Sequence, residues 1–166
     1  MNATERLEAI EAIKRLKAAY FRTMDMKDWE GFRDLFITDC TIDTSEAFTP
    51  MDAAGKPIEA DRPAPPPNND FIIRGIDTFI AAQHFHLDGV STVHHGHMPE
   101  IDLVSDDEAT GLWAMEDKLR WPADSANPMR EMHGYGHYRE RYVRVDGRWK
   151  IASLKLTRIR IDMVMK

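Results

Sequence analysis

Hydrophobic residues recur at helical spacing over the first part of the chain. Asn2, followed three positions later by Glu5, is typical of the capping box that starts a helix. The spacing of the apolar positions then predicts an amphipathic helix from Thr4 to Met24. Its expected buried stripe consists of Leu7, Ile10, Ile13, Leu16, Tyr20, Phe21 and Met24. Asp28 is placed to cap a second, short helix, which would bury Trp29, Phe32, Leu35 and Phe36.

The pattern changes after this helical region. Residues 40–43 predict a first short strand, and the periodicity is then lost over residues 44–70, which contain six prolines. A loop of this length is typical of a functional lid or a disordered excursion, and composition favours neither. A third helix is predicted from Ile76 to about His86, after a turn at Gly75.

The second half of the chain alternates between apolar and polar residues, as strands do. Four strands are predicted, over residues 91–103, 109–121, 133–145 and 149–162. Asp146-Gly147 lies between the last two and is the pair favoured by tight two-residue hairpins. Helices followed by antiparallel strands predict an α+β fold, in which a curved, mostly antiparallel sheet wraps around the N-terminal helices. We expect residues 1–166 to form one domain with a Pro-rich excursion at 44–70.

Charge and composition narrow the function classes. The net charge of −6 argues against nucleic acid, because binding a phosphate backbone requires a clustered basic surface. The single cysteine, Cys40, cannot form an intrachain disulfide, which favours a reducing compartment. We recognise neither a signal peptide nor an apolar run long enough to span a membrane. A cytoplasmic protein without membrane contact is therefore expected.

Two charged residues fall on apolar strand faces. Asp117 shares a face with large hydrophobic residues on the strand 109–121, and Arg158 ends an apolar row on the last strand. A buried carboxylate requires hydrogen bonds, a cation or a proton, so Asp117 is expected to have a compensating role. An Asp117–Arg158 pair would meet this requirement. It could be purely structural or part of a functional site.

Three histidines gather in the segment His94-His95-Gly96-His97. In an extended strand His95 and His97 face one way and His94 the other, unless Gly96 marks a bulge. Two histidines on one face, without an evident third ligand, are too few for a typical closed metal site. The remaining interpretations are surface or hydrogen-bonded core histidines, or a catalytic base inside the barrel.

The end of the first predicted helix carries two further candidates. Tyr20 lies on the apolar stripe, where it would either pack in the core or present its hydroxyl to a site. Asp25 lies just beyond the stripe and is either a solvated turn residue or an acceptor that orients an imidazole.

Taken in order along the chain, these segments resemble the SnoaL-like branch of the nuclear-transport-factor-2-like superfamily, and within it the bile-acid 7α-dehydratases. The segments that carry the resemblance are residues 10–17, 20–22, 25, 96–101, 109–113, 116–117, 146–151 and 158–159. Two features depart from the dehydratases: the segment 44–70 is longer, and the tail after Arg158 is shorter.

The resemblance implies a cone-shaped α+β barrel with a catalytic set of Tyr20, Asp25, His94, Asp117 and Arg158. It implies a dehydratase that acts on a hydrophobic cyclic hydroxy ketone, for which a steroid, a polyketide or another cyclic alcohol is a candidate. No metal or organic cofactor is implied, and His94 would be the base and Asp117 a protonated donor to the leaving group. Apolar contacts with the substrate would come from Trp113, Met115, Leu119 and Tyr138. Isomerisation, dehydrochlorination or cyclisation on the same His–Asp dyad is an alternative, as is a non-catalytic ligand-binding domain. The resemblance also implies a homo-oligomer, either a trimer or a dimer.

Overall fold

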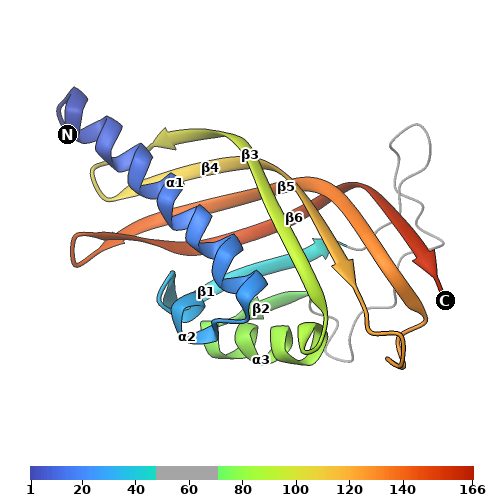
Figure 1. Cartoon of the computed structure of the whole chain (residues 1–166). Helices are drawn as coiled ribbons and strands as arrows, with labels where there is room; N and C mark the ends of the chain where they lie inside the picture. Colours follow the sequence, from blue (N-terminus) through green and yellow to red (C-terminus); the bar gives the residue numbers. More distant parts are fainter. Residues whose placement is uncertain (48–70) are drawn as a thin grey trace.

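The first helix, α1, spans Ala3–Met26 and lies across one face of the sheet (Figure 1). It begins as predicted with a capping box, in which Asn2 accepts a hydrogen bond from the Glu5 amide while the Glu5 side chain accepts from the Asn2 amide. It ends at Lys27, which has the left-handed conformation (φ 57°) common at helix C-termini.

The buried stripe of α1 differs from the predicted one near the N-terminus. Leu7 is 68% exposed, because the first turns of α1 project beyond the sheet. Ile13, Tyr20 and Met24 are buried as expected, and Lys17 is fully buried among them. A charged residue therefore occupies a core position that the apolar pattern does not reveal.

Two shorter helices complete the helical layer below α1 in Figure 1. Helix α2 spans Trp29–Arg33 and is capped by Asp28, whose side chain accepts a hydrogen bond from the Gly31 amide. Helix α3 spans Ile76–Leu87 and starts after Gly75, whose positive φ of 83° a residue with a side chain rarely adopts. Both helices agree with the predicted elements, and Phe79 of α3 packs against Phe32 and Phe36. No helix in the described part of the chain is long and apolar enough to cross a membrane.

The sheet is six-stranded, mixed and not closed, and its strand order is β2-β1-β6-β5-β4-β3. The strands are β1 (Phe36–Glu46), β2 (Ile72–Arg74), β3 (Ser91–Leu103), β4 (Glu108–Arg120), β5 (Met129–Val145) and β6 (Arg148–Met165). All neighbours pair antiparallel except β1 and β6, which are parallel. The fold is thus the predicted α+β arrangement of N-terminal helices and a curved, mostly antiparallel sheet.

The computed structural model describes residues 1–47 and 71–166, so most of the predicted excursion at 44–70 lies outside the described residues. The strand predicted at 40–43 extends on both sides to form the eleven-residue β1. The short β2, which pairs with β1, was not predicted. The hairpin between β5 and β6 turns at Asp146 and Gly147, both with positive φ, as predicted.

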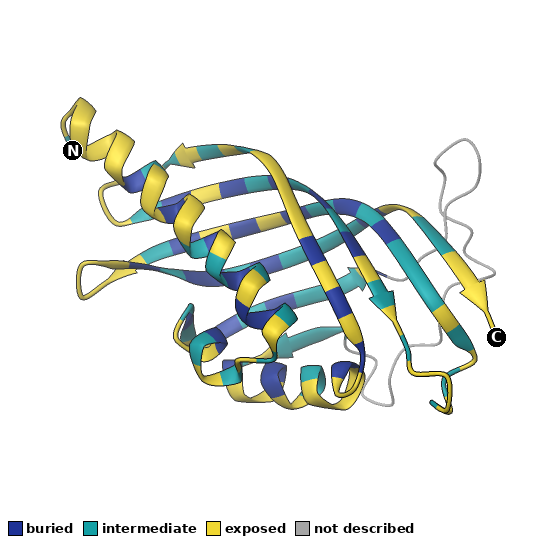
Figure 2. Cartoon of the chain, viewed as in Figure 1, coloured by how far each residue is buried: buried dark blue, intermediate teal, exposed yellow. Residues whose placement is uncertain are grey.

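The face of the sheet that meets the helices is the inner face, and its opposite is the outer face. Buried residues follow alternate positions of β4, β5 and β6 and continue onto the underside of α1 (Figure 2). On β4 the buried residues include Trp113, Met115 and Asp117, as the alternation predicts. Gly96 of β3 lies against the ring of Phe21, which occupies the space of a side chain there. The register of β3 shifts between Gly96 and Pro99, so the irregularity follows Gly96 and leaves the assignment of His94 unchanged.

Candidate functional site

A cavity of about 290 Å³ lies between the inner face of the sheet and helices α1 and α3. Its walls are mainly apolar, and its polar groups come from separate elements. The residues that matter most for its chemistry are Tyr20 on α1, His94 on β3, Asp117 on β4, Tyr138 on β5 and Arg158 on β6. An apolar cavity with a few convergent polar groups is the usual form of a small-molecule site.

His94 is buried and is held by Asp25. Its Nδ1 lies 2.6 Å from Asp25 Oδ1, and its backbone amide donates to Asp25 Oδ2 at 2.9 Å. Because a carboxylate can only accept, the Nδ1 atom carries the proton. In the neutral imidazole Nε2 is then the nitrogen that can accept a proton, and it lies 3.9 Å from Asp117 Oδ2 in the cavity lining. This orientation suits a general base.

Asp25 is held in turn by two residues that the sequence reasoning missed. Thr92 Oγ1 donates to Asp25 Oδ1 at 2.9 Å, and Lys27 Nζ donates to Thr92 Oγ1 at 2.7 Å. Burial alone would raise the pKa of the Asp25 carboxyl, but the hydrogen bonds from His94 and Thr92 outweigh burial and lower it. Asp25 therefore stays ionised beside the imidazole. Thr92 could have been found from strand alternation, because it shares the inner face with His94.

Asp117 and Arg158 form the buried pair that the strand pattern predicts. Arg158 Nη1 and Nη2 donate to the two carboxylate oxygens of Asp117 at 2.8 and 2.7 Å. Burial lowers the pKa of Arg158, but the hydrogen bonds and charge of Asp117 outweigh it and raise that pKa. The pair packs across Gly134, where an added Cβ would overlap both side chains. The bidentate geometry favours an ionised Asp117 that accepts hydrogen bonds, unlike the protonated donor expected from the sequence.

Two tyrosines lie side by side in the cavity wall. The rings of Tyr20 and Tyr138 are 5.8 Å apart, edge to face, and both side chains are buried. Burial, followed by the proximity of Tyr138, raises the pKa of Tyr20 well above its ordinary value, and burial also raises the pKa of Tyr138. Both hydroxyls therefore remain protonated.

The predicted apolar contacts divide into two groups. Leu119 and Tyr138 line the cavity, together with Met24, Phe79 and Leu156. Trp113 and Met115 are buried but lie outside the described lining. Trp113 Nε1 instead donates to the hydroxyl of Tyr142, and Met115 contacts Arg158 through its sulfur. Gln83 and His86 of α3 and Asn127 also line the cavity but were not predicted as site residues. The alternation of apolar and polar residues that located Asp117 is a property of strands and does not apply to a helix or a loop.

His95 and His97 lie on the outer face, away from the cavity. Their nearest ring nitrogens are 3.9 and 4.0 Å from Glu116 Oε1, and Glu116 Oε2 is 2.6 Å from His133 Nε2. Within residues 1–47 and 71–166, no three His, Cys, Asp or Glu side chains are arranged to hold a metal ion. Of the three neighbouring histidines, only His94 faces the site.

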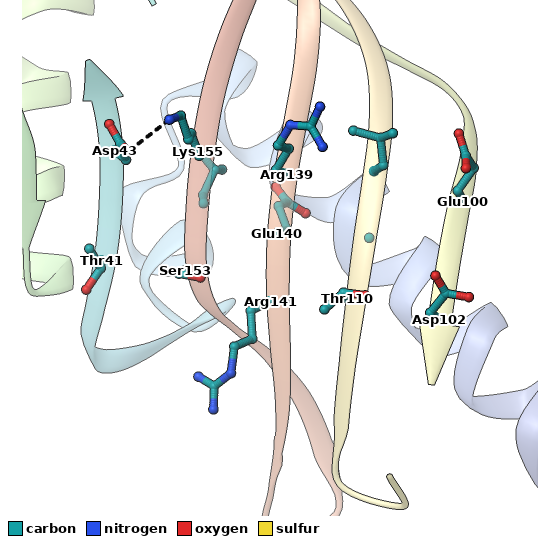
Figure 3. A pocket seen from close by; sticks show the side chains of 13 residues that line it. Thr41, Asp43, Glu100, Asp102, Thr110, Arg139, Glu140, Arg141, Ser153 and Lys155 are labelled. Atoms are coloured by element: carbon teal, nitrogen blue, oxygen red, sulfur yellow. Dashed lines mark ion pairs between the residues drawn. The ribbon is translucent and has the colours of Figure 1, made fainter. Parts of the chain in front are cut away.

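A larger hollow, about 550 Å³, lies on the outer face (Figure 3). It is lined by charged side chains, among them Arg139 and Arg141 on β5 and Glu100 and Asp102 on β3. Some of the charges in this lining are paired, as Lys155 is with Asp43 at 3.5 Å and Arg141 with Glu108. Its lining includes one buried carboxylate, Glu140, which is already paired with Lys17. In the inner cavity His94, Asp117 and Arg158 are buried and converge on a mainly apolar space, so we take that smaller cavity as the candidate site.

Comparison with known proteins agrees with this fold. The profile of the SnoaL-like domain matches residues 5–155. A scytalone dehydratase-like protein from Novosphingobium aromaticivorans superposes with a TM-score of 0.73 at 22% identity, covering 98% of this chain and 92% of its own. Hexachlorocyclohexane dehydrochlorinase LinA-type3 from Novosphingobium barchaimii gives 0.69 at 14% identity, covering 97% and 93%. The Kfla4162 protein from Kribbella flavida gives 0.69 at 21% identity, covering 96% and 93%. At these identities the structures show a shared fold.

Proposed function

The chain belongs to the SnoaL-like domain family, and from this premise we propose that it is a cofactor-independent dehydratase of a hydrophobic cyclic hydroxy ketone. The observation that carries the proposal is the imidazole of His94, fixed at Nδ1 by Asp25 and free at Nε2 toward an apolar cavity. Structural neighbours that include a scytalone dehydratase-like protein and a dehydrochlorinase support an elimination on this fold.

The reaction begins with removal of a proton from the carbon next to the carbonyl. His94 Nε2 takes this proton, and the C–H electron pair moves into the carbonyl to give an enolate. Asp25 stabilises the imidazolium that forms, and the hydroxyl of Tyr20, with Tyr138 beside it, donates to the enolate oxygen. A positioned base of this kind contributes about 10²–10⁴-fold to the rate.

The second step expels the hydroxyl group. The enolate collapses to a carbon–carbon double bond conjugated with the carbonyl, and the C–O bond breaks. Proton delivery to the departing oxygen falls to the His94 imidazolium, because Arg158 occupies both oxygens of Asp117. The products are an enone and water, and His94 returns to its neutral form.

The polar end of the cavity favours loss of water over loss of chloride. The Asp117 carboxylate can accept a hydrogen bond from a substrate hydroxyl, whereas it would repel a departing chloride. The guanidinium of Arg158 already donates to Asp117, the Ala47 carbonyl and the sulfur of Met115, and its charge is largely compensated. At about 290 Å³ the cavity is near the lower limit of ligand sites, which favours a compact ring over a tetracyclic steroid.

The test is turnover of a matched panel of cyclohexanone derivatives, followed by absorbance of the conjugated enone. We expect product from 3-hydroxycyclohexanone, and less or none from the 3-chloro analogue or the β,γ-unsaturated ketone. His94→Ala should lower the rate about 10²–10⁴-fold, whereas His95→Ala, one residue away on the outer face, should leave it unchanged. Binding of the ketones without any enone would identify a ligand-binding domain, and preference for the chloride or the unsaturated ketone would identify a dehydrochlorinase or isomerase.

Assembly is the remaining part of the proposal. A homo-oligomer that uses the outer face of the sheet is expected from the family resemblance, and analytical ultracentrifugation of the purified chain would show whether it forms.

A further inference from the structure

A buried ammonium group lies directly behind the tyrosines of the cavity. Lys17, one turn before Tyr20 on α1, is fully buried, and its Nζ is 3.8 Å from the centroid of the Tyr20 ring and 3.7 Å from that of Tyr138. Lys17 does not belong to the described cavity lining, whereas both tyrosines do. Its charge therefore acts on a ligand from behind the two rings.

The counterion of Lys17 is Glu140, two residues after Tyr138 on the same face of β5. Lys17 donates a hydrogen bond to one carboxylate oxygen of Glu140, and the hydroxyl of Tyr142 donates to the other. Trp113 donates to the oxygen of Tyr142 at 2.8 Å, which completes a chain of satisfied buried groups. A pair of apolar side chains would fill such a space at a lower desolvation cost, so the presence of the ion pair calls for a role beyond packing.

The placement of the ammonium suggests that role. A cation over an aromatic face is attracted to the negative charge of the π system. This attraction grows when the phenol hydroxyl donates a strong hydrogen bond, because the ring then carries more negative charge. Burial makes the hydroxyls of Tyr20 and Tyr138 weak acids, as their raised pKa values show. The charge of Glu140 raises both pKa values further, whereas the ammonium of Lys17, which lies directly over both rings, acts in the opposite direction.

We infer that Lys17 is a positioning residue that strengthens the hydrogen bonds donated by Tyr20 and Tyr138 to an oxyanion in the cavity. The inference rests on the proposed function in so far as the natural oxyanion is an enolate. The property itself, a preference of the cavity for an oxyanion over the corresponding hydroxyl compound, does not require turnover.

The charge of Lys17 depends on pH in a defined range. Burial lowers its pKa to about 8, although Glu140 acts in the opposite direction. The ammonium is therefore present below pH 8 and is lost as the pH rises through that value. Tyr20 and Phe21 from α1 face Lys17, as do Tyr138 and Glu140 from β5. Tyr142 and Trp113 lie beyond Glu140, and Asp117 and Arg158 lie beyond Tyr138.

The experiment measures binding of 4-nitrophenol to the full chain, because the phenol and phenolate forms of this probe are resolved by absorbance. The Kd of each form is determined from pH 5 to pH 10 in the wild type, Lys17→Arg and the double variant Lys17→Met/Glu140→Gln. The double variant removes the cation without leaving an unpaired buried carboxylate. Tyr20→Phe is included to show that the probe contacts the tyrosines.

We expect the wild type to prefer the phenolate, and this preference to fall as the pH rises through about 8. In the double variant the preference for phenolate over phenol should be about tenfold smaller, and it should no longer depend on pH. Lys17→Arg, which retains the charge at all these pH values, should keep the preference above pH 8. Circular dichroism identifies variants that fail to fold. If the double variant does not fold, the pH dependence of the phenolate preference in the wild type tests the inference.

An unchanged preference in a folded double variant would overturn the inference, as would a wild-type cavity with no measurable preference for the phenolate. The outcome is separable from that of the proposed function. A chain that binds phenolate in a Lys17-dependent manner but dehydrates no hydroxy ketone would refute the dehydratase and leave the inference intact.

Discussion

Two histidine–carboxylate pairs occupy consecutive positions across β3 and β4, on opposite faces of the same sheet. His94 is opposite Asp117 on the inner face, and His95 is opposite Glu116 on the outer face. The side chain of His94 is 6% exposed and that of His95 is 54% exposed. The residue types are nearly the same, but their surroundings are not.

On the inner face every partner is fixed. His94 is held by Asp25, and Asp117 by Arg158, in a region with little water to replace these contacts. On the outer face Glu116 is bound by His133, with His95 and His97 farther away, and solvent screens all of them. The comparison teaches that the face of the sheet, rather than the pairing itself, turns a histidine into a candidate base.

The largest effect is expected from breaking the link between Asp25 and His94. Asp25→Asn removes the charge that orients the imidazole and stabilises the imidazolium, so turnover of the hydroxy ketone should fall about 10²–10⁴-fold. The control is Asp88→Asn, which alters an exposed contact with His84 at 3.2 Å and should leave the rate unchanged. Equal rates for wild type and Asp25→Asn would remove Asp25 from the mechanism.

The same variant has a defined effect on acid stability. The pKa of Asp25 in the folded chain is below its ordinary value of 3.8, so its contribution to stability is complete above that pH and is lost as the pH falls through the folded value. The stability difference between wild type and Asp25→Asn, measured by urea unfolding, should therefore shrink below pH 3.8. A difference that grows on acidification would contradict the lowered pKa.

The next effect in size concerns the buried ion pair. Arg158→Met leaves Asp117 buried without its cation and should reduce the free energy of unfolding by about 3–5 kcal/mol. Arg160→Met, two residues further along β6, removes an exposed contact with Asp162 and should leave the urea midpoint unchanged. If the two arginine variants unfold at the same urea concentration, the inner pair has no special role in stability.

A smaller effect is expected at Gly134, over which this pair packs. The added methyl group of Gly134→Ala would displace Arg158 and Asp117, at a cost of about 1–3 kcal/mol, and turnover should fall with it. Gly89→Ala places a methyl group in open space at a positive φ of 75°, which costs about 1–2 kcal/mol by strain alone. The second variant should be destabilised without losing activity. Loss of activity in both would attribute the effect to stability rather than to site geometry.

The smallest effect is expected on the outer face. Glu116→Gln removes the charge that binds His133, and the melting temperature and turnover should both stay near the wild-type values, because solvent compensates exposed charges. Differential scanning fluorimetry and the enone assay would check this. A large loss of turnover would show that the two faces are coupled and that the comparison is too simple.

Much of this arrangement could be predicted because its signals are local. The capping box at Asn2 and Glu5 and the turn at Asp146-Gly147 each depend on a few neighbouring residues. The alternation along β4 placed Asp117 on the inner face in the same way. These features follow from backbone geometry that short segments determine by themselves.

The rest depends on contacts between distant segments. The parallel pairing of β1 with β6 and the three-residue β2 have no local signature. Lys17 is buried because Glu140, 123 residues away, meets it there, and an apolar pattern gives no sign of such a pair. The alternation in β5, which places Glu140 between two buried tyrosines, was the one available clue.

A single continuous helix, α1, carries Tyr20 in the cavity wall, Lys17 behind it and Asp25 against the imidazole of His94. Each residue inserted into a helix turns everything beyond it by about 100°. An insertion or deletion between positions 17 and 25 would therefore swing the carboxylate out of reach of its imidazole, even though the helix itself would survive. Descendants of this protein can vary their loops in length, but this stretch must keep its residue count for the site to persist.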